Sequence, residues 1–320
     1  MAVTANTQET YGVTTILEDL NEAFNSITPT DTPIIKAAGT RKADNTYFEW
    51  TETDLAAVNE SNRVIEGEAA PANDVATNDV RKGNYTQISD KTVEVSHTSN
   101  AVSAAGQRQK MATQKAHKLK ELKRDMAQML MNNVAAAAGA SGTARASAGL
   151  PAFITSNVAR GSGGANGTTS GTGEAGYPNA AATDGTQRAI TETILKTVIA
   201  SCWDAGAEPS LVLCGSSVKQ TISAFTGNAT RYKEAEDSKL NAAIDVYISD
   251  FGELQIVPNR FQRSRDVFVI DPSQVKIAYL EKPKSKPLAE TGHSKRELIW
   301  AEYGLEVCSQ KAHGIIADVS

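Results

Sequence analysis

The sequence is poor in cysteine and in aromatic residues, and it contains no long hydrophobic run. Its three cysteines, Cys202, Cys214 and Cys308, are odd in number and far apart in a chain of 320 residues. This spacing gives neither a disulfide framework nor a Cys-x-x-Cys metal site, and it favours a reducing compartment. Aromatic residues make up 6% of the chain, so we expect thin hydrophobic cores and much surface for neighbours to cover.

Signals for export, membrane insertion and metal binding are also missing. Residues 1–11 lack the basic and apolar regions of a signal peptide, and no apolar run approaches the roughly 20 residues of a membrane-spanning helix. We therefore expect no membrane partner. The sequence has four histidines, His97, His117, His293 and His313. They lie too far apart to form ligand pairs, so we predict no metal and no other cofactor.

An enzyme that binds a nucleotide is the alternative from another functional class. Gly171, Gly173 and Gly176 spell G-x-G-x-x-G, a motif that binds pyrophosphate only between a buried strand and a helix N-terminus. Small and polar residues precede the motif, and a polar stretch to Thr186 follows it. We therefore interpret residues 161–180 as a flexible exposed loop. Cys214 lacks a nearby base and is interpreted as a buried structural thiol, so no catalytic residue is predicted.

The hydrophobic pattern predicts a mixed set of helices and strands behind an N-terminal arm. A short amphipathic stretch, Thr15–Ile27, lies in the arm, and two prolines follow it. Helices are predicted over 101–138, 186–205 and 216–225. Strands are predicted over 46–51, 87–97, 211–214, 244–249, 254–257, 267–270, 275–280, 297–308 and 314–319. Residues 281–287, rich in proline and lysine, are interpreted as a linker.

The helix predicted over 101–138 is the strongest periodic signal. Its apolar residues recur three and four positions apart on one face: Leu119, Leu122, Met126, Met129, Leu130 and Val134. The opposite face carries Lys110, His117, Lys120 and Arg124. At 1.5 Å per residue, such a helix would extend about 57 Å.

Charge is distributed unevenly in this acidic chain. Its net charge of −5 argues against a dedicated nucleic-acid-binding protein. Residues 49–79 carry eight carboxylates and one base, whereas 107–125 carry seven bases and two carboxylates. A long polar loop that buries little of itself usually has a partner. We expect an inter-subunit contact between these six residues: Glu60, Glu66 and Glu68 on the loop, and Lys120, Lys123 and Arg124 on the helix. A solvated loop, and contact of the bases with DNA, remain alternatives.

Six ordered stretches of the sequence resemble the major capsid proteins of tailed bacteriophages and prophages. They are SITPTDTP (26–33), NTYFEW (45–50), KELKRDM (120–126), CWDAGAEP (202–209), VYISDFGELQIVPNR (246–260) and ETGHSKRELIWAEYGLEV (290–307). The resemblance implies the α+β Hong Kong 97-like fold. In its terms, 1–45 is the N-terminal arm, 46–98 an extended E-loop hairpin and 99–186 the P-domain spine helix with a glycine-rich loop. Residues 187–282 are the A-domain, and 283–320 are P-domain return strands.

The resemblance also implies a structural role without enzymatic activity. Hexamers and pentamers of the chain would form an icosahedral shell around double-stranded DNA, and the capsid would assemble in the bacterial host cytoplasm. Portal, scaffold and decoration proteins are further candidate partners. An encapsulin-like compartment is the alternative within the same fold, and the phage-like stretches disfavour it.

Overall fold

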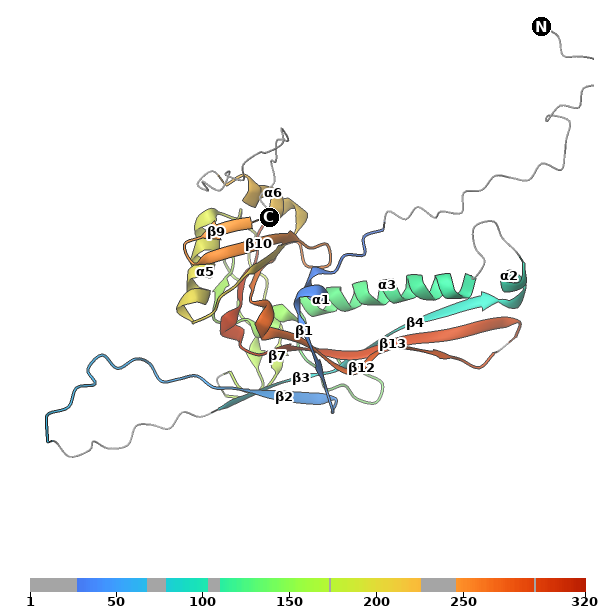
Figure 1. Ribbon diagram of the computed structural model, residues 1–320, viewed down its shortest axis with the longest axis horizontal. Coiled ribbons are helices and arrows are strands. Elements are labelled where there is room, and N and C mark those ends of the chain that lie inside the picture. Colours follow the sequence, from blue (N-terminus) through green and yellow to red (C-terminus); the bar gives the residue numbers. More distant parts are fainter. Residues whose placement is uncertain (1–27, 68–78, 103–109, 173, 226–245, 291) are drawn as a thin grey trace, which may run out of the picture.

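A computed structural model describes residues 28–67, 79–102, 110–172, 174–225, 246–290 and 292–320 (Figure 1). The predicted amphipathic stretch Thr15–Ile27 lies outside these residues, as do Glu68, Arg108 and Gly173. Short elements connect the main ones: α1 (Pro33–Ala37), α2 (His97–Ala101), α4 (Leu150–Phe153), η2 (Pro272–Gln274) and η3 (Gln310–Ala312).

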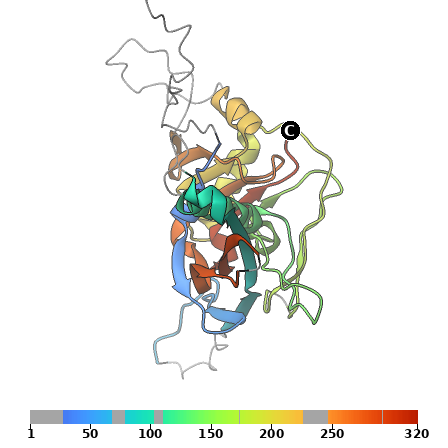
Figure 2. The same cartoon turned by 90° about the vertical axis from the view of Figure 1, so that its right-hand side faces the viewer.

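A four-stranded sheet forms the elongated part of the molecule. Its order is β1 (Gly39–Lys42), β12 (Val275–Pro287), β13 (Ser294–Val307) and β4 (Gln87–Ser96). Helix α3 (Lys110–Met131) lies along one face of this sheet, as the side view and the end view agree (Figures 1 and 2). Leu122 and Met126 of the helix are buried in the same cluster as Val93 and Ile299 of the strands. The predicted apolar face of the helix therefore forms the core here.

The opposite face of this sheet is covered only in part, by the hairpin of β2 (Tyr47–Glu52) and β3 (Val80–Tyr85). Phe48 of the hairpin is buried against Ala278 of β12. Gly304 of β13 permits this approach, since a Cβ added there would lie 2.6 Å from the Phe48 ring. Figure 1 shows the hairpin under the end of the sheet nearest the second sheet, with the distal strands extending beyond it.

A six-stranded sheet forms the second part, in the order β5-β14-β11-β8-β10-β9. The strands are β5 (Val158–Ala159), β14 (Gly314–Ile316), β11 (Val267–Ile270), β8 (Leu211–Cys214), β10 (Gly252–Pro258) and β9 (Val246–Ser249). Helices α5 (Glu192–Asp204) and α6 (Ser216–Ser223) pack on it. The central strands β8 and β11 are buried throughout, which explains their uninterrupted apolar sequences. Both strands have the bounds that the sequence predicts.

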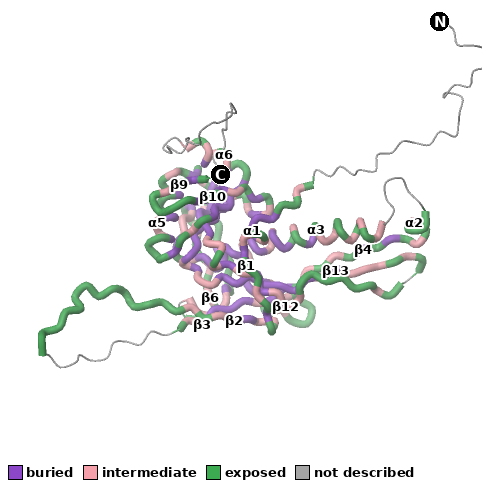
Figure 3. The backbone as a smooth tube through the Cα atoms, in the orientation of Figure 1, coloured by how far each residue is buried: buried purple, intermediate pink, exposed green. Residues whose placement is uncertain are grey.

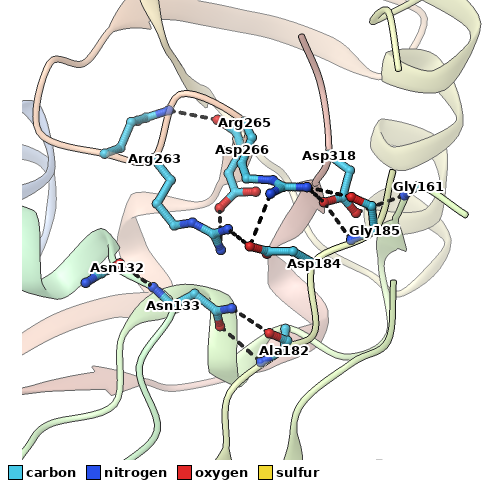
Figure 4. Close-up of polar contacts among 11 residues, drawn as sticks. Asn132, Asn133, Gly161, Ala182, Asp184, Gly185, Arg263, Arg265, Asp266 and Asp318 are labelled. Carbon is cyan, nitrogen blue, oxygen red and sulfur yellow. Dashed lines mark hydrogen bonds and ion pairs between the residues drawn. The ribbon is translucent and has the colours of Figure 1, made fainter. Parts of the chain in front are cut away.

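The glycine-rich segment is exposed for much of its length, as predicted, but it is not irregular throughout. It contains the small hairpin β6 (Thr168–Thr169) and β7 (Pro178–Ala180). Asn133 binds both backbone groups of Ala182, and the buried Asp318 carboxylate accepts from the amides of Gly161 and Gly185 (Figure 4). Polar groups distant in sequence therefore bind the backbone of this segment at its start and its end.

The predicted long helix is also wrong in extent. Helix α3 has 22 residues and ends at Met131, and residue 101 belongs to the separate helix α2. The backbone after Asn132 hydrogen-bonds to other segments, because Ala136 and Ala137 donate to Pro178 and Ala146. Asparagine is a weak helix former, and the paired Asn132 and Asn133 stand where the helix ends. The helix predicted over 186–205 begins later, behind the N-cap Thr191.

Two strand predictions need correction. Residues 281–287 are not a linker, since β12 continues through them as an edge strand, where proline is tolerated. The predicted strand 87–97 does not pair with 46–51. Its counterpart β4 pairs with β13, and the hairpin is closed by β3, which the sequence did not predict. The division into arm, E-loop, P-domain and A-domain remains a prediction.

Candidate interaction surfaces

The loop after β2 exposes four large apolar side chains. Leu55, Val58, Val64 and Ile65 are 88%, 91%, 71% and 76% exposed. Figure 3 shows residues 53–67 as a continuous exposed segment that extends away from the body. Several exposed large apolar side chains within one short segment indicate an interaction site. These apolar residues were not predicted as a contact surface, because the eight carboxylates of residues 49–79 are the stronger signal in the sequence.

The root of this loop is fixed to the body by ion pairs. Lys82 on β3 is buried, pairs with Glu52, and lies 3.1 Å from the Glu174 carboxylate. Gln310 donates to the other oxygen of Glu174 at 2.7 Å. Asp54, two residues beyond the strand, pairs with Lys311. The loop is therefore anchored at Glu52 and Asp54, while its apolar residues lie beyond the anchors.

A pocket of about 410 Å³ lies next to this root. Its lining includes Lys82, Glu174, Gln310 and the backbone of Gly171 and Gly176. The charged groups in the lining are already paired with each other or with Glu52. The strand before the G-x-G-x-x-G segment, β6, has only two residues and is not buried, and none of the described residues 177–190 is helical. The glycines therefore lack the context of a dinucleotide site.

Most of the bases on the predicted basic face of α3 contact other groups of the same chain. Most of its described bases have partners: Lys110 donates to the Ser99 carbonyl, Lys115 pairs with Glu297, Lys118 pairs with Glu121, and Arg124 lies 5.6 Å from the centre of the Phe261 ring. Lys120 and Lys123 are exposed and have no ion pair with any described residue. These two lysines are the accessible members of the predicted basic set.

Among the described residues, the predicted acidic and basic side chains do not meet within one chain. Glu60 and Glu66 are exposed on the loop, and Glu68 lies outside the described residues. Figure 1 places the loop at the left end of the molecule and α3 toward the right. The contact proposed from the sequence would therefore require two copies.

A second exposed apolar surface lies on the six-stranded sheet. Trp203 of α5 and Phe251 of the β9–β10 turn have ring centres 5.2 Å apart, and both are exposed. Val246 and Ile248 point outward from β9, the edge strand. Exposed aromatic pairs of this kind are common at protein interfaces.

The remaining polar chemistry has structural roles. Cys202 and Cys214 are buried, as predicted for Cys214, and burial raises the pKa of Cys202 to about 12 and that of Cys214 to about 11. Within the described residues, no group of three or more His, Cys, Asp or Glu side chains is arranged to hold a metal ion. None of the helices in that part of the chain is long and apolar enough to cross a membrane.

A charged cluster joins the glycine-rich segment to the second sheet (Figure 4). Asp184 receives hydrogen bonds from Arg263 and Arg265, and Arg265 also binds the buried Asp318 at 2.6 Å. Asp266 is buried 3.4 Å from Arg263. Burial raises the pKa of Asp266 to about 6, and the Arg263 charge opposes this shift. The cluster therefore joins the glycine-rich segment to residues 263–266, which the predicted division places in another domain.

Comparison with known proteins identifies one family along the chain. The sequence profile described as SU10 major capsid protein matches residues 3–320. A curated protein, the major capsid protein of Escherichia phage Phieco32, is 34% identical over 109 residues. That alignment covers 34% of this chain and 31% of the phage protein, so the chain matches about a third of that relative's length.

Solved structures with the same fold cover nearly the whole chain. A chain from Mycobacterium phage Adephagia has a TM-score of 0.58 at 12% identity and covers 99% of both chains. The capsid of cyanophage P-SCSP1u gives 0.57 at 11% identity, covering 96% of this chain and 93% of the other. An encapsulin complex from Synechococcus elongatus gives 0.56 at 11%, covering 95% and 96%. These likenesses show the predicted Hong Kong 97-like fold, which phage capsids and an encapsulin share.

Proposed function

The chain belongs to the SU10 major capsid protein family, and from that membership we propose that its copies form the hexamers and pentamers of an icosahedral shell around double-stranded DNA. It is a phage major capsid protein, a structural component of the virion capsid and not an enzyme. The family match over residues 3–320 carries the proposal. It also favours the phage capsid over the encapsulin-like alternative, which the fold alone does not distinguish.

The loop 53–67 supplies the physical reason for assembly. Its exposed apolar side chains give a single subunit apolar surface that contact with another subunit would remove from water. A small aromatic content and thin cores are consistent with a subunit stabilised by its neighbours. Assembly in the host cytoplasm, and contacts with portal, scaffold and decoration proteins, belong to the same proposal.

The inter-subunit contact of Glu60, Glu66 and Glu68 with Lys120, Lys123 and Arg124 remains a proposal. Because Arg124 packs on Phe261, Lys120 and Lys123 are the cations that would carry it. The competing partner of these two lysines is the phosphate backbone of packaged DNA. The variant Lys120→Glu/Lys123→Glu separates the two partners, since loss of shells indicates a neighbour, and intact shells with reduced DNA content indicate DNA.

Electron microscopy of the purified full-length chain tests the proposed assembly. We expect closed shells with hexameric and pentameric units in images of the protein. A protein that remains monomeric at high concentration, with or without a co-expressed scaffold, would contradict the proposal. Nucleotide affinity of such a monomer would instead favour the enzyme alternative.

A further inference from the structure

Two histidines lie side by side at the distal end of the four-stranded sheet. The ring centres of His97 and His293 are 5.0 Å apart, and the ring planes are inclined by 60°. The two residues are nearly two hundred positions apart in the sequence, so their spacing along the chain gives no sign of the pair. Figure 1 shows α2, which begins at His97, beside the start of β13 at the end of the elongated sheet farthest from the second sheet.

The register of the sheet places both side chains on one face. Ser96 of β4 pairs with Ser294 of β13, and His97 and His293 are the next opposing positions of these antiparallel strands. The His97 amide donates to the His293 carbonyl at 3.2 Å, which extends the ladder by one step. Residues directly opposite each other in antiparallel strands point to the same side, with Cβ atoms about 4.5–5.5 Å apart. The backbone therefore brings the two rings together.

The backbone is held in place on both sides of the histidine pair. Ser96 caps α2, since its hydroxyl accepts from the Ser99 amide at 3.1 Å. The Ser99 carbonyl in turn accepts from Lys110 of α3 at 2.7 Å. On the other strand, Gly292 has a φ of +85°, a left-handed conformation that glycine adopts without strain. Such contacts reduce the conformational entropy that is lost when both rings bind one ligand.

The separation of the rings fits two ligands of one metal ion. With a metal–nitrogen bond of about 2.0–2.1 Å, the centre of an imidazole ring lies about 3.2 Å from the metal. Two rings on one ion then have centres about 4.5 Å apart at a right angle and about 5.2 Å apart at the tetrahedral angle. The observed 5.0 Å lies between these values. The backbone can therefore stay in place when both rings bind one ion.

Glu290 supports such a site without being one of its ligands. Its Oε2 atom lies 3.5 Å from Nε2 of His97, beyond the range of a short hydrogen bond. In the described part of the chain, no group of three His, Cys, Asp or Glu side chains is arranged around one ion. A carboxylate beside Nε2 favours the tautomer with its proton on that atom, which leaves the lone pair of Nδ1 for a metal. The negative charge of Glu290 also attracts a cation.

The ring nitrogens are accessible from solvent. The side chains of His97 and Glu290 are 41% and 54% exposed, and His293 is exposed. Neither ring has a side-chain hydrogen bond or ion pair with a described residue other than Glu290. Glu94 and Arg296, three positions away on the two strands, bind each other at 3.2 Å. An ion can therefore reach both rings without displacing a protein partner among the described residues.

We infer that His97 and His293 form a binding site for one divalent transition-metal ion. Imidazole nitrogen is a ligand for Zn²⁺, Cu²⁺ and Ni²⁺, whereas Mg²⁺ and Ca²⁺ require oxygen ligands. A tetrahedral ion with two protein ligands keeps two positions for water or for a donor of another molecule. The bound ion joins the end of β4 to the start of β13. This site is a property of the single subunit and goes beyond the proposed function.

Isothermal titration calorimetry with Zn²⁺ tests the site on the purified full-length chain. We expect saturation at one ion per chain at about pH 7.5, and no binding of Mg²⁺ at the same concentration. His97→Gln and His293→Gln should each weaken Zn²⁺ binding at least tenfold, because each removes one of two ligands. The matched control His117→Gln removes the exposed histidine of α3 and should leave the affinity within about twofold of wild type.

The pH dependence and the spectrum of a bound probe ion provide independent measurements. Protons compete with the metal for the ring nitrogens, so the Zn²⁺ affinity should fall at least tenfold between about pH 7.5 and about pH 5.5. With Cu²⁺ in place of Zn²⁺, electron paramagnetic resonance should show hyperfine coupling to two imidazole nitrogens. Each single variant should show coupling to one nitrogen or none. Circular dichroism checks that the variants fold.

Three results would overturn the inference. The first is a Zn²⁺ affinity that survives both His97→Gln and His293→Gln, and the second is an equal loss of affinity in His117→Gln. The third is coupling of Cu²⁺ to a single nitrogen in wild type, since the two rings would then not share the ion. None of these measurements uses shell formation, so failure of the metal site leaves the proposed function unaffected.

Discussion

At the scale of single residues, the buried Asp266 of the charged cluster makes the stability of the folded chain depend on pH. Burial raises the pKa of its carboxyl from 3.8 to about 6 in the folded chain. The folded state therefore binds this proton more readily than the unfolded state, and its contribution to stability increases as the pH falls from 7 toward 4. The change amounts to at most about 3 kcal/mol.

The variant Asp266→Asn removes this titration. Relative to wild type, we expect it to gain stability at about pH 7.5 and to lose that advantage at about pH 4.5. Urea unfolding of unassembled subunits across this range measures the difference. If the stabilities of the variant and of wild type change in parallel with pH, then Asp266 does not titrate between about pH 4.5 and about pH 7.5.

His313 changes the stability of the folded chain in the opposite direction as the pH falls. Burial lowers the pKa of its imidazole to about 4, so the ring stays neutral in the folded chain, where Nδ1 accepts from the Asp271 amide. The unfolded chain takes up a proton near pH 6.5, so stability is lost as the pH falls from 6.5 toward 4. The loss amounts to about 3 kcal/mol at most.

We expect His313→Gln to abolish this acid sensitivity. In wild type, Asp266 and His313 act in opposite directions between pH 4 and 6.5, so their effects partly cancel. Acidification should therefore stabilise the His313→Gln subunit and destabilise the Asp266→Asn subunit. The same urea titrations measure both slopes, and slopes of equal sign would disprove the assignment.

At the scale of elements, the close contact between β13 and the β2–β3 hairpin depends on Gly304. A Cβ at this position would meet the Phe48 ring at 2.6 Å and the Tyr85 carbonyl at 3.0 Å. Overpacking of this kind costs about 1–3 kcal/mol. We predict that Gly304→Ala destabilises the subunit by this amount in denaturant unfolding.

Gly39→Ala is the matched control on the same sheet. A Cβ there would meet the flexible side chain of Lys276 at 3.3 Å and the Val275 carbonyl at 3.7 Å. We expect a much smaller loss of stability from this variant. Equal losses from the two variants would show that the Phe48 contact is not the cause.

Elements with uninterrupted apolar sequences were predictable from the sequence. Strands β8 and β11 have the predicted bounds because their side chains are buried on both faces. Strand β3 was not predicted, since its sequence VRKGNY places a lysine in the interior. That lysine, Lys82, is tolerated because Glu52 and Glu174 neutralise it, and these partners are distant in sequence.

The candidate interaction site was predictable in part. The uneven charge of the chain indicated the loop and α3 as contact surfaces, which stays a prediction, and the structure shows that Lys120 and Lys123 are exposed. Local sequence did not reveal that Arg124 packs on Phe261 or that the distal sheet is bare on one side. Both features depend on residues more than one hundred positions apart.

At the scale of the whole molecule, the four apolar side chains of the loop are expected to drive assembly. Burial of a Leu or Val side chain contributes about 1.5–3 kcal/mol. The variant Leu55→Ser/Val58→Ser should therefore lose about 3 kcal/mol or more per contact, which is about a hundredfold in the association constant. Both residues are exposed in one subunit, so its own stability should not change.

Light scattering as a function of subunit concentration measures this effect. The control Glu60→Gln/Glu66→Gln removes two carboxylates from the same loop and keeps the apolar residues. We expect it to change mainly the salt dependence of assembly, since exposed charges are screened by salt. A larger effect from the control would assign the contact to charge rather than to apolar burial.

The buried ion pairs of Lys82 have a consequence for the curvature of the shell. They hold the first residues of the loop at a constant angle to the rest of the subunit, whereas the contact itself lies farther along the chain. We therefore expect the tilt between adjacent copies to depend on Glu52 and Lys82, and the strength of their association to depend on Leu55 to Ile65. On this proposal, the size of the container and its cohesion depend on separate residues.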